Sequence, residues 1–179
     1  SCQRDRNFPA ESRKFAFQLR LLMTLRRCKE LVVIAHNIRS LYNIGSIFRT
    51  SDAVGVKKIF LTGFSGTPDT SKVAKVALGA EKAVPWEKHS RIGDLLKRLR
   101  SDGYSIIALE QDKESILYSS LRPRFPVALI VGNEVSGIPR AVLGRVDAII
   151  EIPNNGTKES LNVAVAYGIA VYSILRPQW

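Results

Sequence analysis

The sequence has few of the residues that build disulfide or metal sites. It contains two cysteines, Cys2 and Cys28, and two histidines, His36 and His89. The cysteines are too few for a disulfide scaffold and lack the spaced partners of a zinc site. We therefore expect no metal, and we expect both histidines to be ordinary polar or partly buried side chains rather than acid–base catalysts.

Long apolar runs are also missing. No stretch approaches the roughly 18 to 20 apolar residues that a membrane span needs. Residues 1–6, Ser-Cys-Gln-Arg-Asp-Arg, lack the apolar segment of a signal peptide. We expect a cytoplasmic protein with no membrane contact.

Common nucleotide and hydrolase motifs are absent as well. There is no Walker loop and no G-x-S-x-G turn, and Gly-Phe-Ser-Gly at 63–66 falls short of the dinucleotide fingerprint. Kinase, NTPase, α/β-hydrolase and dehydrogenase functions therefore lose their main support.

Positive charge is abundant. The chain has 27 Lys and Arg residues against 16 Asp and Glu, a net charge of +11, with a pI near 10.0. Residues 1–30 carry eight basic and three acidic side chains, so +5 of this charge lies there. Such an excess indicates a polyanionic partner, of which nucleic acid is the natural candidate. A basic helix over about 12–29 could either contact RNA or simply be solvated.

The apolar pattern alternates between strand-like and helix-like segments, which favours an α/β fold with a mostly parallel sheet covered by helices on both faces. We expect a basic, helical N-terminal extension over residues 1–30 and one domain over 31–179. The predicted strands are 31–35, 58–62, 84–86, 104–109, 127–131 and 148–152. The predicted helices are 44–54 ending at Gly55, 72–78 ending at Gly79, a helix to 101 capped by Ser90, a turn opened by Pro139, and a helix to 175 capped by Ser160.

Three polar clusters follow apolar runs or open helices: residues 43–49, 132–137 and 160–163. In a parallel α/β fold they would gather at the carboxyl ends of the strands, where such sheets bind ligands. Each cluster alone is weak, because Asn, Gly and Ser are common in turns and caps. Together and in this order they predict one site.

These clusters resemble the three signature motifs of the SpoU, or TrmH, family of RNA ribose 2′-O-methyltransferases in the SPOUT superfamily. The first is Asn-x-Gly-x-x-x-Arg-Thr at 43–50, and the second is Leu-Ile-Val-Gly-Asn-Glu-x-x-Gly-Ile-Pro at 129–139. The third is Ile-Pro at 152–153 followed by Ser-Leu-Asn-Val-Ala-Val-Ala at 160–166. Asn154 and Ala164 depart from the pattern, where Met and Ser are common, without touching its polar core.

The resemblance implies a deep trefoil knot in the C-terminal region and an S-adenosylmethionine cofactor held largely by main-chain groups. The corresponding cofactor-binding residues are Leu109, Gly132, Ile152 and Leu161. Close approach of a ligand to the backbone would explain the glycines. The family also implies a homodimer whose site is completed across the interface, to which an apolar stripe of Leu161, Val165, Ile169 and Tyr172 is suited, although a monomer core could use that stripe equally well.

The family motifs also imply the catalytic set, which is Arg49, Asn43, Glu134, Asn162 and Ser160. Arg49 would lie near the reactive ribose and phosphate. A guanidinium normally stays protonated, which suits a phosphate clamp better than a base. Asn43 would orient Arg49 or the substrate, and Glu134 would accept hydrogen bonds from the ribose or Arg49. Ser160 and Asn162 would lie at a helix start beside the ligand.

Several functions remain open. The most consistent is S-adenosylmethionine-dependent methylation of an RNA ribose 2′-hydroxyl, with tRNA favoured over rRNA because small family members often act on tRNA. A base-methylating relative and a non-catalytic RNA-binding protein are the rivals. The motif at 43–49 favours ribose methylation over base methylation. The presence of all the polar residues of the three motifs disfavours a non-catalytic RNA-binding protein.

Overall fold

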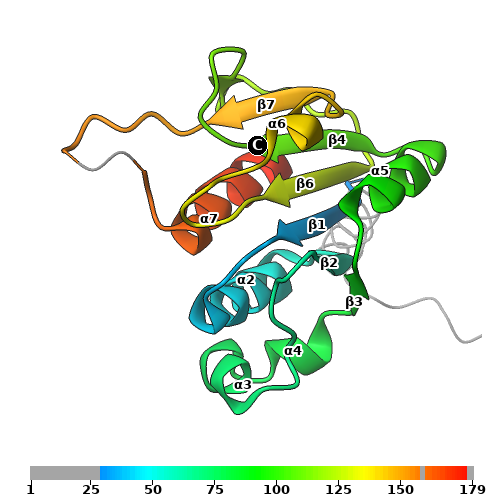
Figure 1. The fold of residues 1–179 in the computed structure, drawn as a ribbon, viewed down its shortest axis with the longest axis vertical. Coiled ribbons are helices and arrows are strands. Elements are labelled where there is room, and N and C mark those ends of the chain that lie inside the picture. Colours follow the sequence, from blue (N-terminus) through cyan, green and yellow to red (C-terminus); the bar gives the residue numbers. More distant parts are fainter. Residues whose placement is uncertain (1–28, 158–159, 177–179) are drawn as a thin grey trace, which may run out of the picture.

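The computed structural model describes residues 29–157 and 160–176. Within these residues, seven strands form one sheet in the order β3-β2-β1-β6-β4-β7-β5, and all of their pairings are parallel (Figure 1). The strands are β1 (Leu31–His36), β2 (Lys58–Thr62), β3 (Trp86–His89), β4 (Ser105–Leu109), β5 (Ile116–Leu117), β6 (Val127–Val131) and β7 (Ala148–Glu151). The predicted parallel α/β sheet is confirmed.

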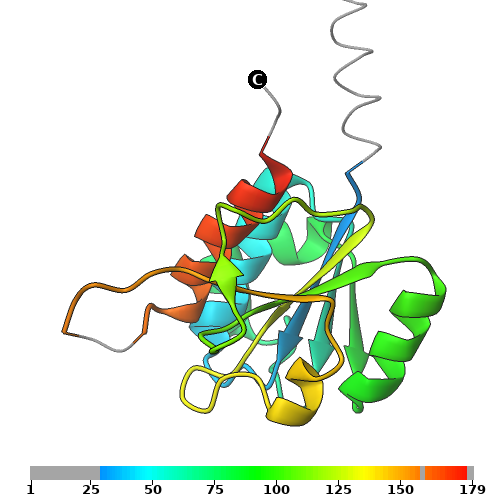
Figure 2. The same ribbon diagram turned by 90° about the horizontal axis from the view of Figure 1, so that it is seen from above.

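Helices cover both faces of the sheet. They are α2 (Leu41–Val54), α3 (Ser71–Ala77), α4 (Ala80–Ala83), α5 (Ile92–Ser101), α6 (Arg140–Leu143) and α7 (Val163–Leu175). Figure 2 shows α2 and α7 on one side of the sheet and α5 on the other. One apolar cluster joins the sheet to α2, α3, α4 and α7, and a second joins it to α5 and α6.

The central strands β1 and β6 are buried along their whole length. A strand covered on both faces needs apolar residues at every position, which explains the unbroken apolar runs of these two segments. Their register places Ala35 level with Val131, and Val131 level with Leu109 of β4. The residues that follow these three strands therefore emerge at one edge.

Several predicted element ends were wrong. Helix α2 starts at Leu41 rather than residue 44, with Ser40 as its N-cap. Arg91 rather than Ser90 precedes α5, and α3 ends at Ala77 with Leu78 rather than Gly79 as its C-cap. The predicted strand at 84–86 begins only at Trp86, and β5 was not predicted at all. Gly55 ends α2 as predicted, with φ of 74°.

The predicted extension over 1–30 lies outside the described residues except for Lys29 and Glu30. No helix in the described ranges has the length and apolar character needed to cross a membrane.

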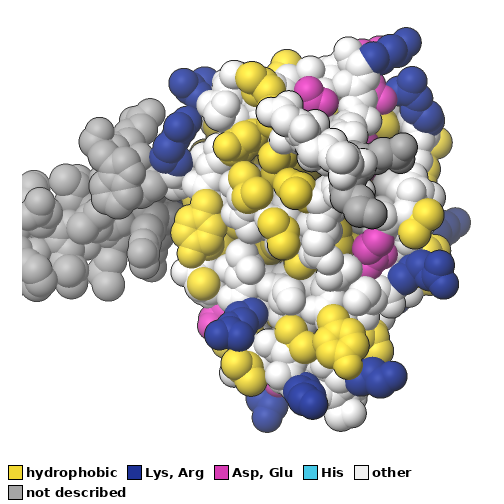
Figure 3. All heavy atoms as spheres, turned by 90° about the vertical axis from the view of Figure 1, so that its left-hand side faces the viewer, with side chains coloured by type: hydrophobic (Ala, Val, Ile, Leu, Met, Phe, Trp, Pro, Cys, Tyr) yellow, Lys and Arg dark blue, Asp and Glu magenta, His cyan; other side chains and the backbone are white. Residues whose placement is uncertain are grey.

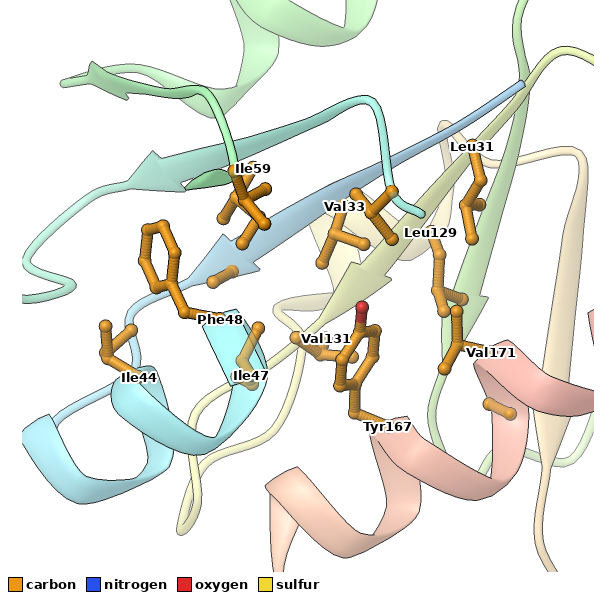
Figure 4. Packing of buried hydrophobic residues seen from close by; sticks show 14 of the residues in the cluster. Leu31, Val33, Ile44, Ile47, Phe48, Ile59, Leu129, Val131, Tyr167 and Val171 are labelled. Carbon is orange, nitrogen blue, oxygen red and sulfur yellow. The ribbon is translucent and has the colours of Figure 1, made fainter. Parts of the chain in front are cut away.

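A single buried hydrogen bond joins α7 to α2. Tyr167 is fully buried among apolar side chains of α2, β1 and β6 (Figure 4). Its hydroxyl lies 2.7 Å from Oγ of Ser51, which is also fully buried. Burial raises the pKa of the Tyr167 phenol, although the hydrogen bond with Ser51 lowers it slightly. The tyrosine therefore stays neutral, and the polar pair satisfies itself inside the core.

Tyr167→Phe should lower the free energy of unfolding by about 1–3 kcal/mol, because Ser51 keeps its buried hydroxyl and loses its partner. Urea unfolding measures this change. Tyr42→Phe, at an exposed position of α2, is the matched control and should change stability by less than about 0.5 kcal/mol. Adding Ser51→Ala to Tyr167→Phe should restore part of the loss. Equal stability of Tyr167→Phe and wild type would contradict a role for this bond.

Candidate active site

One pocket opens at the carboxyl edge of the sheet, with about 690 Å³ of empty space including its mouth. Its wall contains all four predicted cofactor residues, Leu109, Gly132, Ile152 and Leu161. Strand register explains why Leu109, Gly132 and Ile152 lie close together, because Leu109 pairs with both Val131 and Ile150.

The loop after β6 is folded tightly on itself. Asn133 exchanges two backbone hydrogen bonds with Gly137, and its side-chain Oδ1 accepts from the amides of Val135 and Ser136 at 2.9 Å each. Its Nδ2 donates to the carbonyl of Asn37 at 2.7 Å. Asn133 therefore shapes the loop and ties it to the end of β1.

Gly132 has a reason within the fold besides the predicted approach of a ligand. A Cβ at this position would lie 2.7 Å from the carbonyl carbon of Gly137 and 2.8 Å from the amide nitrogen of Ile138. The protein's own backbone therefore excludes a side chain here. Gly137 has φ of 64°, a left-handed conformation that favours glycine. Both glycines are required by the loop before any ligand is considered.

Glu134 joins this loop to the start of α2. Its carboxylate accepts hydrogen bonds from the amides of Arg39 and Ser40, at 3.0 Å each, and from Nδ2 of Asn43 at 2.9 Å. Burial raises the pKa of Glu134, but the hydrogen bonds from Arg39, Asn43 and Ser40 lower it by more, so the net pKa lies below its ordinary value. Glu134 is therefore ionised at neutral pH.

Asn162 extends the same network. Its Nδ2 donates to Oδ1 of Asn43 at 3.1 Å, while its own Oδ1 accepts from the amides of Ala164 and Val165. Asn162, rather than Ser160, is thus the N-cap of α7, and this corrects the prediction. Three polar side chains from the three sequence clusters, Glu134, Asn43 and Asn162, form one chain of hydrogen bonds beside the pocket.

Arg49 and Ser160 lie apart from this network. Arg49 is exposed on α2, and its guanidinium makes no hydrogen bond or ion pair with another described residue. Ser160 is exposed and precedes the pocket residue Leu161. Neither residue belongs to the pocket wall as described. In a single chain, the expected contact between Arg49 and Glu134 is absent from the described residues.

Sequence reasoning missed Glu110. This residue follows β4 directly and contributes to the pocket wall. Its carboxylate accepts hydrogen bonds from the amides of Ile138 at 2.8 Å and Gln111 at 3.0 Å. The signal that could have found it is a carboxylate placed directly after an apolar strand of a parallel sheet.

The histidines have structural environments. His36 is buried, and burial lowers its pKa. Asn37 Nδ2 lies 3.2 Å from His36 Nε2, so that Nε2 accepts and Nδ1 donates to Thr62 Oγ1 at 2.8 Å. His89 lies 2.6 Å from a Glu87 carboxylate oxygen on the edge strand β3. Among the described residues, no group of three or more His, Cys, Asp or Glu side chains could hold a metal ion.

These features define an α/β protein with an open pocket, lined by apolar and acidic residues, at the carboxyl edge of a parallel sheet. A model of the SpoU rRNA Methylase family matches residues 30–172, so the chain belongs to this family.

Relatives and solved structures agree with this assignment. The chain is 34% identical over 152 residues to a tRNA (guanosine(18)-2'-O)-methyltransferase of Aquifex aeolicus, covering 84% of this chain and 71% of that protein. It is 30% identical to the 23S rRNA (guanosine-2'-O-)-methyltransferase RlmB of Ralstonia nicotianae, and the match covers 93% of this chain and 67% of that protein. An AdoMet-bound rRNA methyltransferase from Sinorhizobium meliloti has a TM-score of 0.78 at 29% identity, with 85% of this chain and 59% of that chain covered. Several curated relatives are longer, and the chain spans 58% of their length.

Glu134 should make stability depend on pH. Because its pKa is lower in the folded protein than its ordinary value of 4.5, its stabilising effect is complete above that value and is lost as pH falls through the folded pKa. Wild type should therefore be more stable than Glu134→Gln at pH 7, and the difference between their free energies of unfolding should decrease as the pH is lowered. Urea unfolding of both proteins across this pH range measures the difference. Glu114→Gln, an exposed carboxylate, should show little difference at any pH, and a constant difference for Glu134→Gln would contradict the assignment.

Proposed function

We propose that this protein binds S-adenosylmethionine in the pocket and methylates the 2′-hydroxyl of a ribose in RNA. The observation that carries the proposal is the hydrogen-bonded chain of Glu134, Asn43 and Asn162 beside a pocket lined by Leu109, Gly132, Ile152 and Leu161. Membership of the SpoU family supports both the cofactor and the reaction.

The described pocket fits this cofactor chemically. Its wall combines apolar side chains with the carboxylates of Glu110 and Glu134, and none of its described residues is Lys, Arg or His. Such a wall suits a ligand with positive charge and disfavours the phosphates of a nucleotide. S-adenosylmethionine supplies a methyl group on a positively charged sulfur, open to in-line attack by an oxygen.

The chain's own residues would orient the ribose and handle its charge. Glu134, ionised at neutral pH, can accept a hydrogen bond from a ribose hydroxyl, and Asn43 holds that carboxylate in place. The exposed hydroxyl of Ser160 and amide of Asn162 lie at the start of α7, where they can contact the RNA. Arg49 would bind the phosphate next to the reacting ribose.

A homodimer would explain the distance between Arg49 and the pocket. The side chains of Leu161, Val165, Ile169 and Tyr172 are between 36% and 61% exposed. The alternative that a monomer core buries this stripe is therefore wrong. Figure 3, viewed from the side on which α7 lies, shows hydrophobic side chains gathered at the centre of that face. A second copy of the chain is the proposed occupant, because packing against the start of α7 would bring its own Arg49 toward the site.

The strand order supports the implied trefoil knot. From β4 the chain runs to the edge strand β5 and then returns past β7 and β4 to β6, which lies between β1 and β4. It then crosses β4 again to reach β7. The segment that follows β7 returns to α7, which packs on α2 and β4. We propose that the chain threads the loop formed by these crossings on its way from β7 to α7. A chain trace in an experimental structure tests this path.

RNA class is the finer part of the proposal. The net charge of +11 suits a polyanion, and the relatives named above act on tRNA and on 23S rRNA. We favour tRNA. Incubation with isotope-labelled S-adenosylmethionine and separate unmodified tRNA and rRNA pools, followed by nucleoside mass spectrometry, tests both atom and RNA. Label in a 2′-O-methylated nucleoside from tRNA is expected. Label in a 2′-O-methylated nucleoside from rRNA would show that the substrate is rRNA rather than tRNA. Label on a base would favour a base methyltransferase. No label despite measurable RNA binding would favour a non-catalytic RNA-binding protein.

Arg49→Ala should lower the rate of RNA methylation by roughly 100-fold, because a group that holds the reacting phosphate is lost. Cofactor affinity, measured by calorimetry, should stay unchanged. Arg124→Ala is the matched control, since Arg124 is exposed just before β6 at the opposite edge of the sheet. Full activity of Arg49→Ala together with an inactive Asn43→Ala would show that the roles are wrongly assigned.

Val165→Asp should convert the dimer to monomers at micromolar concentration, because an aspartate buried in an apolar interface loses its hydration without a partner. Sedimentation measures the change. Leu78→Asp, which also replaces an exposed apolar residue but lies beyond α3, should leave the dimer intact. A monomeric wild type, or a dimeric Val165→Asp protein, would count against this interface.

A further inference from the structure

Glu110 carries a negative charge that no described cation neutralises. Its two carboxylate oxygens accept hydrogen bonds from the backbone amides of Ile138 and Gln111, which are neutral donors. The ion pairs found among residues 29–157 and 160–176 do not include Glu110. The side chain is only partly exposed, so water screens its charge incompletely.

Glu134, the second carboxylate in the pocket wall, also has no described cation to neutralise its charge. Glu134 accepts its hydrogen bonds from two backbone amides and from the Asn43 amide, all of which are neutral. The described wall contains no Lys, Arg or His. The pocket therefore presents negative charge, although the chain as a whole carries +11.

We propose that Glu110 makes the pocket selective for the charge state of its ligand, favouring the cationic methyl donor over its neutral demethylated product. This inference rests on the proposed function. During transfer the bond from sulfur to the methyl carbon breaks and a bond from that carbon to the ribose oxygen forms. The bonding electrons return to sulfur, which becomes a neutral thioether, and the hydroxyl proton of the ribose is released to water. The ligand thus loses one positive charge, and its attraction to Glu110 disappears.

Glu134 already accepts a hydrogen bond from Asn43 at the start of α2, so its replacement would also disturb Asn43. Glu110 is therefore the better position to test charge alone. Glu110→Gln keeps the size of the side chain and one carbonyl oxygen that can accept from Ile138 or Gln111. Glu114→Gln removes the same charge four residues further on, from an exposed side chain that is not part of the described pocket wall.

Calorimetry with three ligands tests the proposal. S-adenosylmethionine and sinefungin, which carries an ammonium group near the position of the sulfonium, are cationic at this point, and S-adenosylhomocysteine is neutral there. Glu110→Gln should weaken binding of both cations about tenfold, as expected for one charge pair in a partly screened site. Binding of S-adenosylhomocysteine should change by less than about twofold. Glu114→Gln should bind all three as wild type does.

An equal loss for all three ligands would overturn the proposal and leave Glu110 with a structural role in holding Ile138. If thermal unfolding shows that Glu110→Gln does not fold, wild type provides the second test. Raising the salt concentration should then weaken binding of the two cations more than that of the neutral ligand, and parallel salt curves would contradict charge selection. Failure of wild type to bind S-adenosylmethionine at all would instead overturn the proposed function.

Discussion

The carboxylate of Glu134 is the contact on which the site depends. It comes from the loop after β6, yet its hydrogen bonds come from residues that open α2. The first amides of a helix have no partner within the helix, and here a side chain from a loop distant in the sequence accepts from the amide of Ser40 at the helix N-cap. Asn43, held by this carboxylate, in turn accepts from Asn162, the N-cap of α7. One ionised group therefore fixes the relative positions of three segments that are far apart in the sequence, which couples the shape of the site to its protonation.

Charge is divided between the pocket and the rest of the chain. The overall excess of basic residues suits a polyanion, whereas the described pocket wall contains carboxylates and no basic side chain. The two proposed ligands have opposite requirements, because RNA is negative and the methyl donor is positive at its reactive sulfur. Separating the two kinds of charge lets one small domain attract both without either site competing for the other ligand.

Much of the fold and of the site follows from the sequence, and what does not has physical reasons. Unbroken apolar runs identified β1 and β6, and the shared edge of parallel strands predicted that the three polar clusters would gather. The family resemblance, rather than the pattern, indicated that Leu109, Gly132 and Ile152 would line one pocket. Helix starts were less certain, because Ser160 and Asn162 are both good caps and only the contact with Asn43 selects the second. Gly132 is explained by the backbone of Gly137 and Ile138, which no local pattern reveals. The two-residue strand β5 is too short to give a periodic signal, and Glu110 looks like an ordinary loop residue until Ile138 is placed beside it.

A crystal structure of the protein with S-adenosylmethionine bound tests the assignment of the site most directly. We expect the cofactor between the ends of β4 and β6 and the segment that leads into α7, with Glu134 still bonded to Asn43. A cofactor bound elsewhere, or a Glu134 side chain that leaves the start of α2 when the cofactor is present, would contradict the assignment.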